Sequence, residues 1–170
     1  MNAVVVYESH WGNTAAVAQA IADGIGSGAR ALNTDEATRE ILSGVDLIVA
    51  GSPVIAFALP RDGALHQLER DEKAPVPPDV SHPLLRTWLD NLRVGRGFGA
   101  AFETRIWWSL RGATGTIETK LQNSGYERLV PGERFMVQGG YGPLRDGELE
   151  RARKWGVELA NALSEHLVPA

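Results

Sequence analysis

Short runs of apolar residues alternate along the chain with segments in which apolar residues recur every three or four positions. Residues 3–7 (AVVVY) form a continuous, mostly β-branched run, which is typical of a strand buried on both faces of a parallel sheet. From Thr14 the apolar positions follow helical spacing, and Gly26 and Gly28 predict where that helix ends. The chain therefore opens with a strand followed by an amphipathic helix.

The same alternation continues to the end of the chain. Further strands are predicted over 29–32, 45–50, 98–102, 127–130 and 134–137. Further helices are predicted over 36–42, 84–92 and 116–124. The sequence "GSP" at 51–53 is expected to stop the strand before it. Residues 61–83 are polar and contain "PVPP", so we interpret them as a loop or excursion that is too short to be a second domain.

The last helix is marked by charge as well as by periodicity. Glu148 and Glu150 are suited to its first turn, where the helix dipole favours negative charge. One apolar stripe is expected to face the sheet, and it comprises Leu149, Ala152, Gly156, Leu159 and Leu163. Strands that alternate with helices in this way indicate an α/β fold, with a parallel sheet between two helical layers. We expect residues 1–170 to form one domain.

Composition narrows the possible functions. The net charge of −4 and the lack of a basic face argue against nucleic-acid binding. There is no cysteine, which excludes disulfides, thiolate metal sites and cysteine nucleophiles, and no Asp/Glu/His set has the spacing of a metal site. No signal peptide or membrane-spanning run is evident, so the expected location is the cytoplasm.

Ligands of parallel α/β sheets bind beyond the carboxyl ends of the strands, which directs attention to the loops there. The first of these loops, "SHWGNT" (9–14), joins a strand to a helix whose first amides lack partners and favour an anion. Ser9, Asn13 and Thr14 add polar side chains, and Gly12 permits close approach of the backbone. The loop has no lysine, unlike a P-loop, and lacks a dinucleotide fingerprint. It therefore suits a single monophosphate, although a simple capped helix is the alternative.

Three later loops offer further candidates. "GSPVIAF" (51–57) supplies apolar residues suited to a flat heteroaromatic ring. "ETRIWWSLRG" (103–112) contains Arg105 and Arg111, either of which could stabilise a reduced ring or bind a substrate carboxylate. The adjacent Trp107 and Trp108 would face opposite ways in an extended segment. "VQGGYGPL" (137–144) either lines the same cleft or simply connects the last strand to the last helix.

These segments together resemble the flavodoxins. "VVVYESHWGNTAAVAQAIADGI" is similar to the opening of that family with its first loop, and "VDLIVAGSPV" to its third strand and the flavin loop after it. "FGAAFETRI" is similar to the strand and loop that carry the other face of the flavin. "FETR" and "GGYGPLRDGELERARKWG" look closest to proteins grouped near the flavodoxin-type protoporphyrinogen oxidases. The resemblance implies a three-layer flavodoxin-like fold, with a five-stranded parallel sheet in the order 2-1-3-4-5 and non-covalently bound FMN.

The resemblance also implies roles for particular residues. The FMN phosphate would be surrounded by Ser9, His10, Trp11, Gly12, Asn13 and Thr14. The isoalloxazine would contact Ser52, Pro53, Val54 and Ile55 from one loop, and Thr104 and Arg105 from the next. Trp11 stands where electron-carrier flavodoxins usually have a hydroxyl, so one side-chain donor is lost, and its ring either leans toward the flavin or packs on the surface.

The function implied is transfer of electrons by a flavin, which the protein binds and tunes. An oxidoreductase acting on a small organic substrate, such as a quinone or porphyrinogen, is the leading interpretation. The alternatives are an electron shuttle to a protein partner and a flavodoxin-like interaction module without cofactor. A phosphorylation-receiver domain is disfavoured, because Glu8 is the only acid directly after the first strand and no lysine stands directly after the last strand.

Overall fold

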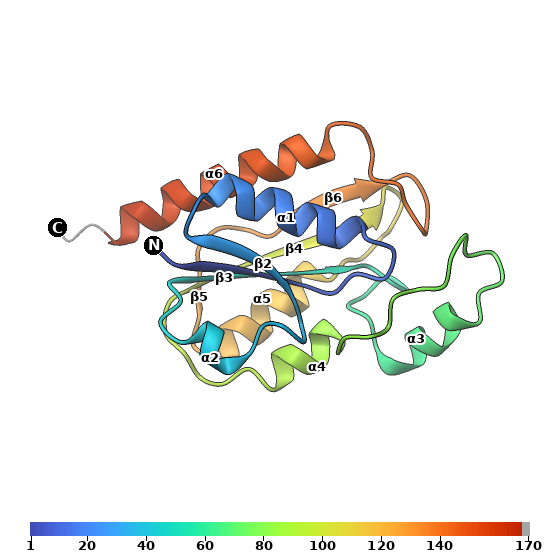
Figure 1. Cartoon of the computed structure of the whole chain (residues 1–170), viewed down its shortest axis with the longest axis horizontal. Helices are drawn as coiled ribbons and strands as arrows, with labels where there is room; N and C mark the ends of the chain where they lie inside the picture. The colour runs from blue at the N-terminus through green and yellow to red at the C-terminus, as the bar shows by residue number, and fades with distance from the viewer. Residues whose placement is uncertain (168–170) are drawn as a thin grey trace.

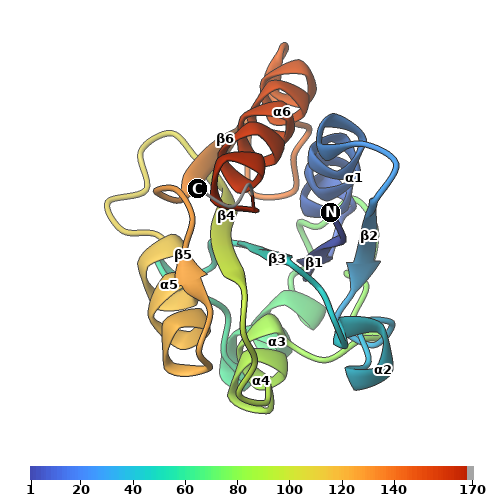
Figure 2. The same cartoon turned by 90° about the vertical axis from the view of Figure 1, so that its left-hand side faces the viewer.

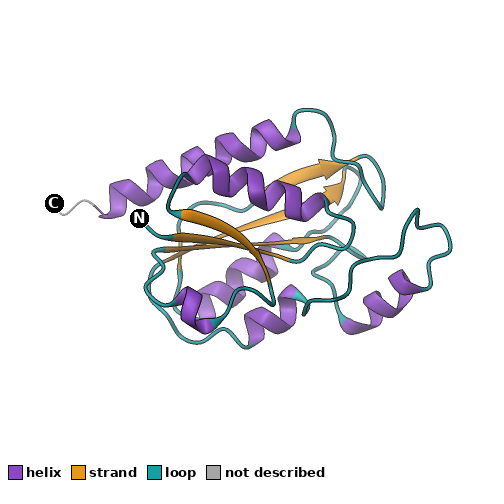
Figure 3. Ribbon diagram, in the orientation of Figure 1, coloured by secondary structure: helices purple, strands orange, loops and turns teal. Residues whose placement is uncertain are grey.

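The computed structural model describes residues 1–167, which form one parallel sheet with helices packed on both faces (Figures 1, 2 and 3). The strands are β1 (Ala3–Tyr7), β2 (Ala29–Asn33), β3 (Leu47–Pro53), β4 (Phe98–Ile106), β5 (Glu127–Arg128) and β6 (Glu133–Val137). The helices are α1 (Asn13–Ile25), α2 (Arg39–Leu42), α3 (Asp62–Glu69), α4 (Leu85–Asp90), α5 (Thr114–Asn123) and α6 (Glu148–Leu167).

The strand order β2-β1-β3-β4-β5 confirms the predicted flavodoxin-like topology. β6 also pairs with β4, so the fifth position of the sheet is shared by two short strands. β5 pairs with the beginning of β4 at Phe98 and Gly99, whereas β6 pairs with its last five residues, from Phe102 to Ile106. β4 therefore extends beyond the predicted 98–102, because its carboxyl half has a partner of its own.

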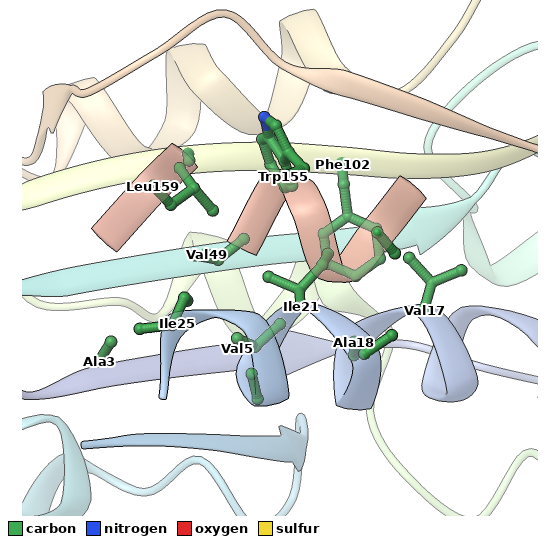
Figure 4. Close-up of a cluster of buried hydrophobic side chains, with 14 of the residues drawn as sticks. Ala3, Val5, Val17, Ala18, Ile21, Ile25, Val49, Phe102, Trp155 and Leu159 are labelled. Carbon is green, nitrogen blue, oxygen red and sulfur yellow. The ribbon is translucent and has the colours of Figure 1, made fainter. Parts of the chain in front are cut away.

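Alternate residues of each central strand face opposite helical layers. Val5 and Val49 point toward α1 and α6, where they join Ile21 and Leu159 in one buried cluster (Figure 4). Val4 and Ile48 point the other way and pack with the helices of the opposite face. Since both faces are covered, the strands consist of nearly uninterrupted apolar residues, as the sequence indicates.

Two sequence predictions are wrong at the edges of elements. Residues 61–83 contain the helix α3, which buries none of its residues and so lacks a clear apolar stripe. The sequence at 51–53 does not stop its strand, because β3 continues to Pro53, which pairs with Thr104. β1 already ends opposite Gly51, so proline at the end of β3 removes no hydrogen bond to that neighbour.

The apolar stripe of α6 also differs from the prediction by one residue. Leu149 is 46% exposed, whereas Trp155, which the predicted stripe omits, is 6% exposed and packs against Phe135. None of the helices within residues 1–167 is both long and apolar enough to cross a bilayer.

The packing of α1 on α6 yields a stability prediction. A Cβ placed on Gly156 lies only 2.2 Å from the carbonyl oxygen of Ile21 and 3.0 Å from the Cα of Gly24. Gly156→Ala should therefore lower the free energy of unfolding by about 1–3 kcal/mol through overpacking, measured by urea denaturation. Gly63→Ala in α3 is the matched control, because that Cβ meets no atom within 4 Å. Equal stability of the two variants would contradict this account.

Candidate functional site

The carboxyl ends of β1, β3, β4 and β6 meet at one edge of the sheet, at the right of Figure 1. The loops that follow them enclose a cleft of about 80 Å³. Its lining comprises Ser9, His10, Trp11, Asn13, Thr14, Pro53, Val54, Ile55, Thr104, Arg105, Ile106, Val137 and Gly140. The structure thus brings together all the residues predicted for the site except Gly12, Ser52 and Arg111.

The start of α1 leaves backbone donors available at this cleft. Gly12 precedes the helix with φ 85°, a conformation that favours glycine, and no side chain caps the helix. The first amide to bond back is that of Ala16, which donates to the Gly12 carbonyl at 3.0 Å. The amides of residues 13–15 are therefore unpaired within the described chain, and the helix dipole makes their surroundings favourable to an anion.

The hydroxyls around the helix start add to this donor set. Ser9 Oγ is buried and has no hydrogen-bond partner among residues 1–167. The hydroxyls of Thr14 and Thr104 lie 2.8 Å apart, so one donates to the other and the second proton stays available. An unpaired buried hydroxyl costs stability, which a phosphoryl oxygen accepting its proton would restore. These residues fit the phosphate of FMN on the chemistry of their donors.

His10 has a different role from the one expected, because both of its ring nitrogens are engaged within the protein. Nε2 lies 2.8 Å from Glu8 Oε1, and Nδ1 lies 2.7 Å from the carbonyl oxygen of Asp79. Both partners are acceptors, so the geometry favours an imidazolium facing a carboxylate. Glu8 is fully buried, and its other oxygen accepts the amide proton of Leu85 at 2.7 Å.

The pair shifts the pKa of His10 upward. Burial by itself lowers that pKa, but the hydrogen bond to Glu8, the bond to the Asp79 carbonyl and the nearby negative charges outweigh it. His82 stacks on His10 with ring centroids 6.1 Å apart, and its Nε2 faces the Ser9 carbonyl oxygen at 3.1 Å. Sequence reasoning missed the role of Glu8, although an acid directly after a buried strand was a signal for it.

Residues 61–83, which we call the covering segment, are fastened over the first loop. The Asp79 amide donates to the His10 carbonyl at 2.8 Å, and the Trp11 indole donates to the Val76 carbonyl at 3.1 Å. Trp11 also meets the ring of Tyr141 edge to face at a centroid distance of 5.0 Å. The covering segment and the loop after β6 therefore hold Trp11 from two sides, rather than leaving it packed on an open surface.

Tyr141 joins the covering segment to the loop after β6. Its hydroxyl donates to the Asp71 carboxylate at 2.5 Å, and its carbonyl accepts from the Asn13 amide group at 3.1 Å. The hydrogen bond between the Tyr141 hydroxyl and the Asp71 carboxylate raises the pKa of Tyr141 and lowers the pKa of Asp71. Gly140 lines the cleft beside it. Of the two interpretations of "VQGGYGPL", the structure supports the one in which this loop forms part of the cleft.

The opposite wall of the cleft is a tight turn after β3. Ile55 and Ala58 exchange two backbone hydrogen bonds of 3.0 and 3.1 Å, and the residues between them both have positive φ, 49° for Ala56 and 61° for Phe57. Non-glycine residues in this conformation are strained, and such strain concentrates at functional sites. Ser52 lies behind this wall, fully buried, with its hydroxyl bonded to the Pro53 carbonyl.

Arg105 and Arg111, which the sequence leaves equivalent, are separated by the fold. The Arg105 guanidinium is mostly buried and pairs with Glu103 at 3.1 Å, while its Nη2 donates to the Ser109 carbonyl. Its Nε is buried without a partner among the described residues. Glu103 also accepts the amides of Ala113 and Thr114, which fastens the start of α5. Arg111 is exposed and does not line the cleft.

The residues after β4 form an apolar rim outside the cleft. β4 ends at Ile106, so Trp107 and Trp108 are not in an extended segment, and both are exposed, by 65% and 52%. Trp108 meets Phe57 edge to face at a centroid distance of 6.0 Å, and Phe57 is itself 43% exposed. Leu110 is 91% exposed. We call Phe57, Trp107, Trp108 and Leu110 the apolar rim.

The Glu8–His10 pair predicts a pH dependence of stability. The folded-state pKa of His10 is raised above its ordinary value of 6.5, so its stabilising contribution is complete below that value and is lost as pH rises through the folded pKa. His10→Asn should remove this loss from the curve of unfolding free energy against pH, whereas the exposed His66→Asn should leave it unchanged. An NMR titration that gives His10 a pKa at or below 6.5 would contradict the pair.

Known proteins support the fold and the family of the chain. The flavodoxin family profile matches residues 5–155. A flavodoxin from the domain Archaea superimposes with a TM-score of 0.67 at 22% identity, over 96% of this chain and 99% of that one. Oxidised flavodoxin 1 from Bacillus cereus superimposes with a TM-score of 0.64 at 17% identity, over 99% of this chain and 100% of that one.

A larger protein shares the same fold in one of its parts. The flavodiiron protein from Giardia intestinalis matches with a TM-score of 0.67 at 18% identity, over 97% of this chain but 36% of that protein. No curated protein sequence matches the chain. The family profile covers most of the sequence, and the strand order and the loop after β1 agree with it. The chain therefore belongs to the flavodoxin family.

Proposed function

We propose that this chain is a single-domain FMN-dependent oxidoreductase that exchanges electrons with a small, flat organic substrate such as a quinone or porphyrinogen. Membership of the flavodoxin family makes FMN its cofactor and electron transfer its chemistry. Bound FMN supplies one- and two-electron redox chemistry, and the protein contributes binding, orientation and electrostatics. The apolar rim beside the cleft is the observation that favours a small organic substrate.

The donors at the start of α1 and the apolar residues opposite them suit different parts of FMN. The amides of residues 13–15 and the Ser9 hydroxyl fit the phosphate. Val54 and Ile55 offer the apolar contact that an aromatic ring requires. The enclosed cleft of about 80 Å³ is smaller than the ~300 Å³ of pockets that enclose ligands of drug size. We therefore place the ring at the mouth of the cleft, beside the apolar rim.

The apolar rim bears on both candidate functions within the family. Phe57, Trp107 and Trp108 are large and exposed, and large exposed apolar surfaces mark binding sites. Aromatic side chains stack well on flat conjugated molecules. A shuttle that docks on a protein partner is the second candidate, favoured by the same exposure, because aromatic residues are also enriched in protein interfaces.

Ser9 tests the proposed phosphate site. Ser9→Ala should weaken FMN binding about tenfold, because one hydrogen bond to a charged oxygen is lost. Binding of riboflavin, which has no phosphate, should be unchanged, and the protein without flavin should not be destabilised, because Ser9 Oγ has no partner to lose. Flavin fluorescence titrations of both proteins with both ligands measure this. Equal losses for FMN and riboflavin would show that Ser9 does not bind phosphate.

Arg105 tests the proposed tuning of the flavin. Its Nε is the guanidinium atom without a protein partner, so it can donate to the polar edge of the ring. Arg105→Lys keeps the charge but lacks this donor, and should lower the FMN midpoint potential by about 30 mV, equivalent to roughly 1.4 kcal/mol for two electrons. The exposed Arg111→Lys is the matched control and should leave the potential unchanged. Equal potentials for both variants would remove Arg105 from this role.

Stopped-flow oxidation of the reduced, FMN-loaded protein tests the proposed function itself. We expect quinones to oxidise it rapidly with saturation, and Trp108→Ala to raise the quinone concentration at half-saturation several-fold. A rate that rises linearly with quinone concentration and is unaffected at Trp108 would favour the shuttle instead. Purified protein that neither retains FMN nor binds it in a titration would indicate an interaction module without cofactor.

A further inference from the structure

A second concave site lies on the opposite side of the molecule from the flavin cleft. It occupies about 510 Å³ between α2, α4 and the segments that lead into β3 and β4. These segments stand at the amino ends of the strands, whereas the flavin cleft is at the carboxyl ends. In Figures 1 and 2 α2 and α4 lie on the face of the sheet away from α1 and α6. The volume is within the range of pockets for small molecules.

The floor of this site is apolar and aromatic. Trp88 and Leu42 line it from α4 and α2, and both are partly buried against the hydrophobic cluster that contains Val4 and Ile48. Tyr126 also lines the site; it is buried, and its hydroxyl forms no hydrogen bond within residues 1–167. The site exists because α2 has only four residues and buries none of them. So short a helix does not fill the helical layer on this part of the sheet.

Three arginines, Arg39, Arg93 and Arg96, surround this floor, and we call the whole the arginine groove. No ion pair among residues 1–167 involves any of them, and no carboxylate lines the groove. Asp90 pairs with Lys120, and Asp46 pairs with the amino terminus. Glu40, the neighbour of Arg39 in the chain, interacts with the charge of Arg39 but does not line the groove. The concentration of positive charge is unusual in a chain whose net charge is −4.

From this arrangement we infer that the arginine groove binds a small organic anion with a flat apolar body and a carboxylate, sulfonate or phosphate group. Trp88 and Leu42 would contact the body, while the guanidinium groups would take the acidic group in charge-assisted hydrogen bonds. Binding would also relieve the mutual repulsion of three like charges around one hollow. The groove shares no lining residue with the flavin cleft, so this site is independent of the proposed redox function.

A pair of matched probes tests the inference on the FMN-loaded protein. We use 2-naphthoate, and as its uncharged counterpart 2-naphthalenemethanol, in titrations followed by ¹H–¹⁵N NMR. The indole N–H of Trp88, which donates to the Ala37 carbonyl at 3.0 Å, is the reporter in the groove. We expect 2-naphthoate to shift this signal and to bind at least about tenfold more tightly than the alcohol, because charged hydrogen bonds are worth about that factor each.

Variants of the arginines test whether their positive charge is responsible for the binding of 2-naphthoate. Arg93→Gln with Arg96→Gln should weaken 2-naphthoate binding at least tenfold, and the corresponding double Lys variant should weaken it less. Arg70→Gln, which removes an exposed arginine outside the groove, is the control and should have no effect. Equal affinity for the acid and the alcohol, unchanged binding by the double Gln variant, or shifts confined to the flavin cleft would each overturn the inference.

Discussion

The unsatisfied start of α1 is the constraint on which the functional end of this molecule depends. A helix that follows a buried parallel strand must begin with amides that have no partner in their own helix. Here Gly12 replaces a capping side chain, and the Ser9 hydroxyl is buried beside it without a partner. A protein that leaves so many donors unpaired at one place is poised to bind an anion there. The remaining loops of the cleft are arranged around that point.

The Glu8–His10 pair shows how the first loop is held while those donors stay available. Both ring nitrogens of His10 and both oxygens of Glu8 are used in bonds to the protein itself. A buried ion pair gains little net stability from its charges, because desolvation opposes the attraction. Its effect here is geometric, since it fastens the loop after β1 to the covering segment and to the start of α4. A histidine in a ligand-binding motif thus serves the architecture of the site.

Two concave sites at opposite ends of the same strands differ in the way they attract an anion. At the carboxyl ends, amides and hydroxyls point into the cleft, while the basic side chains in its lining, His10 and Arg105, are paired with Glu8 and Glu103. This arrangement suits one phosphate approached closely by the backbone. At the amino ends, three guanidinium groups surround an open aromatic floor, which suits a larger organic acid. The cleft at the carboxyl ends arises from the start of α1, which is a regular feature of the topology. The arginine groove at the amino ends arises because α2 is short.

The sequence by itself determined the topology and identified the loop after β1 as the candidate phosphate site. Continuous apolar strands alternating with amphipathic helices admit few other arrangements, and the residues of a strand-to-helix turn are adjacent in the chain, so their roles can be inferred from local chemistry. The helix α3 escaped prediction because it buries no residues.

Only the tertiary structure decided which of the equivalent side chains belong to the site. Arg105 and Arg111 stand six residues apart in one short segment of the sequence. Arg105 is mostly buried against Glu103 within β4, because β6 extends the pairing of β4 through residue 106, whereas Arg111 follows the strand and is exposed. The contacts of His10 with Asp79 and of Trp11 with Val76 join segments more than sixty residues apart. Such contacts leave no periodicity in the sequence, because they follow from how the covering segment returns across the cleft.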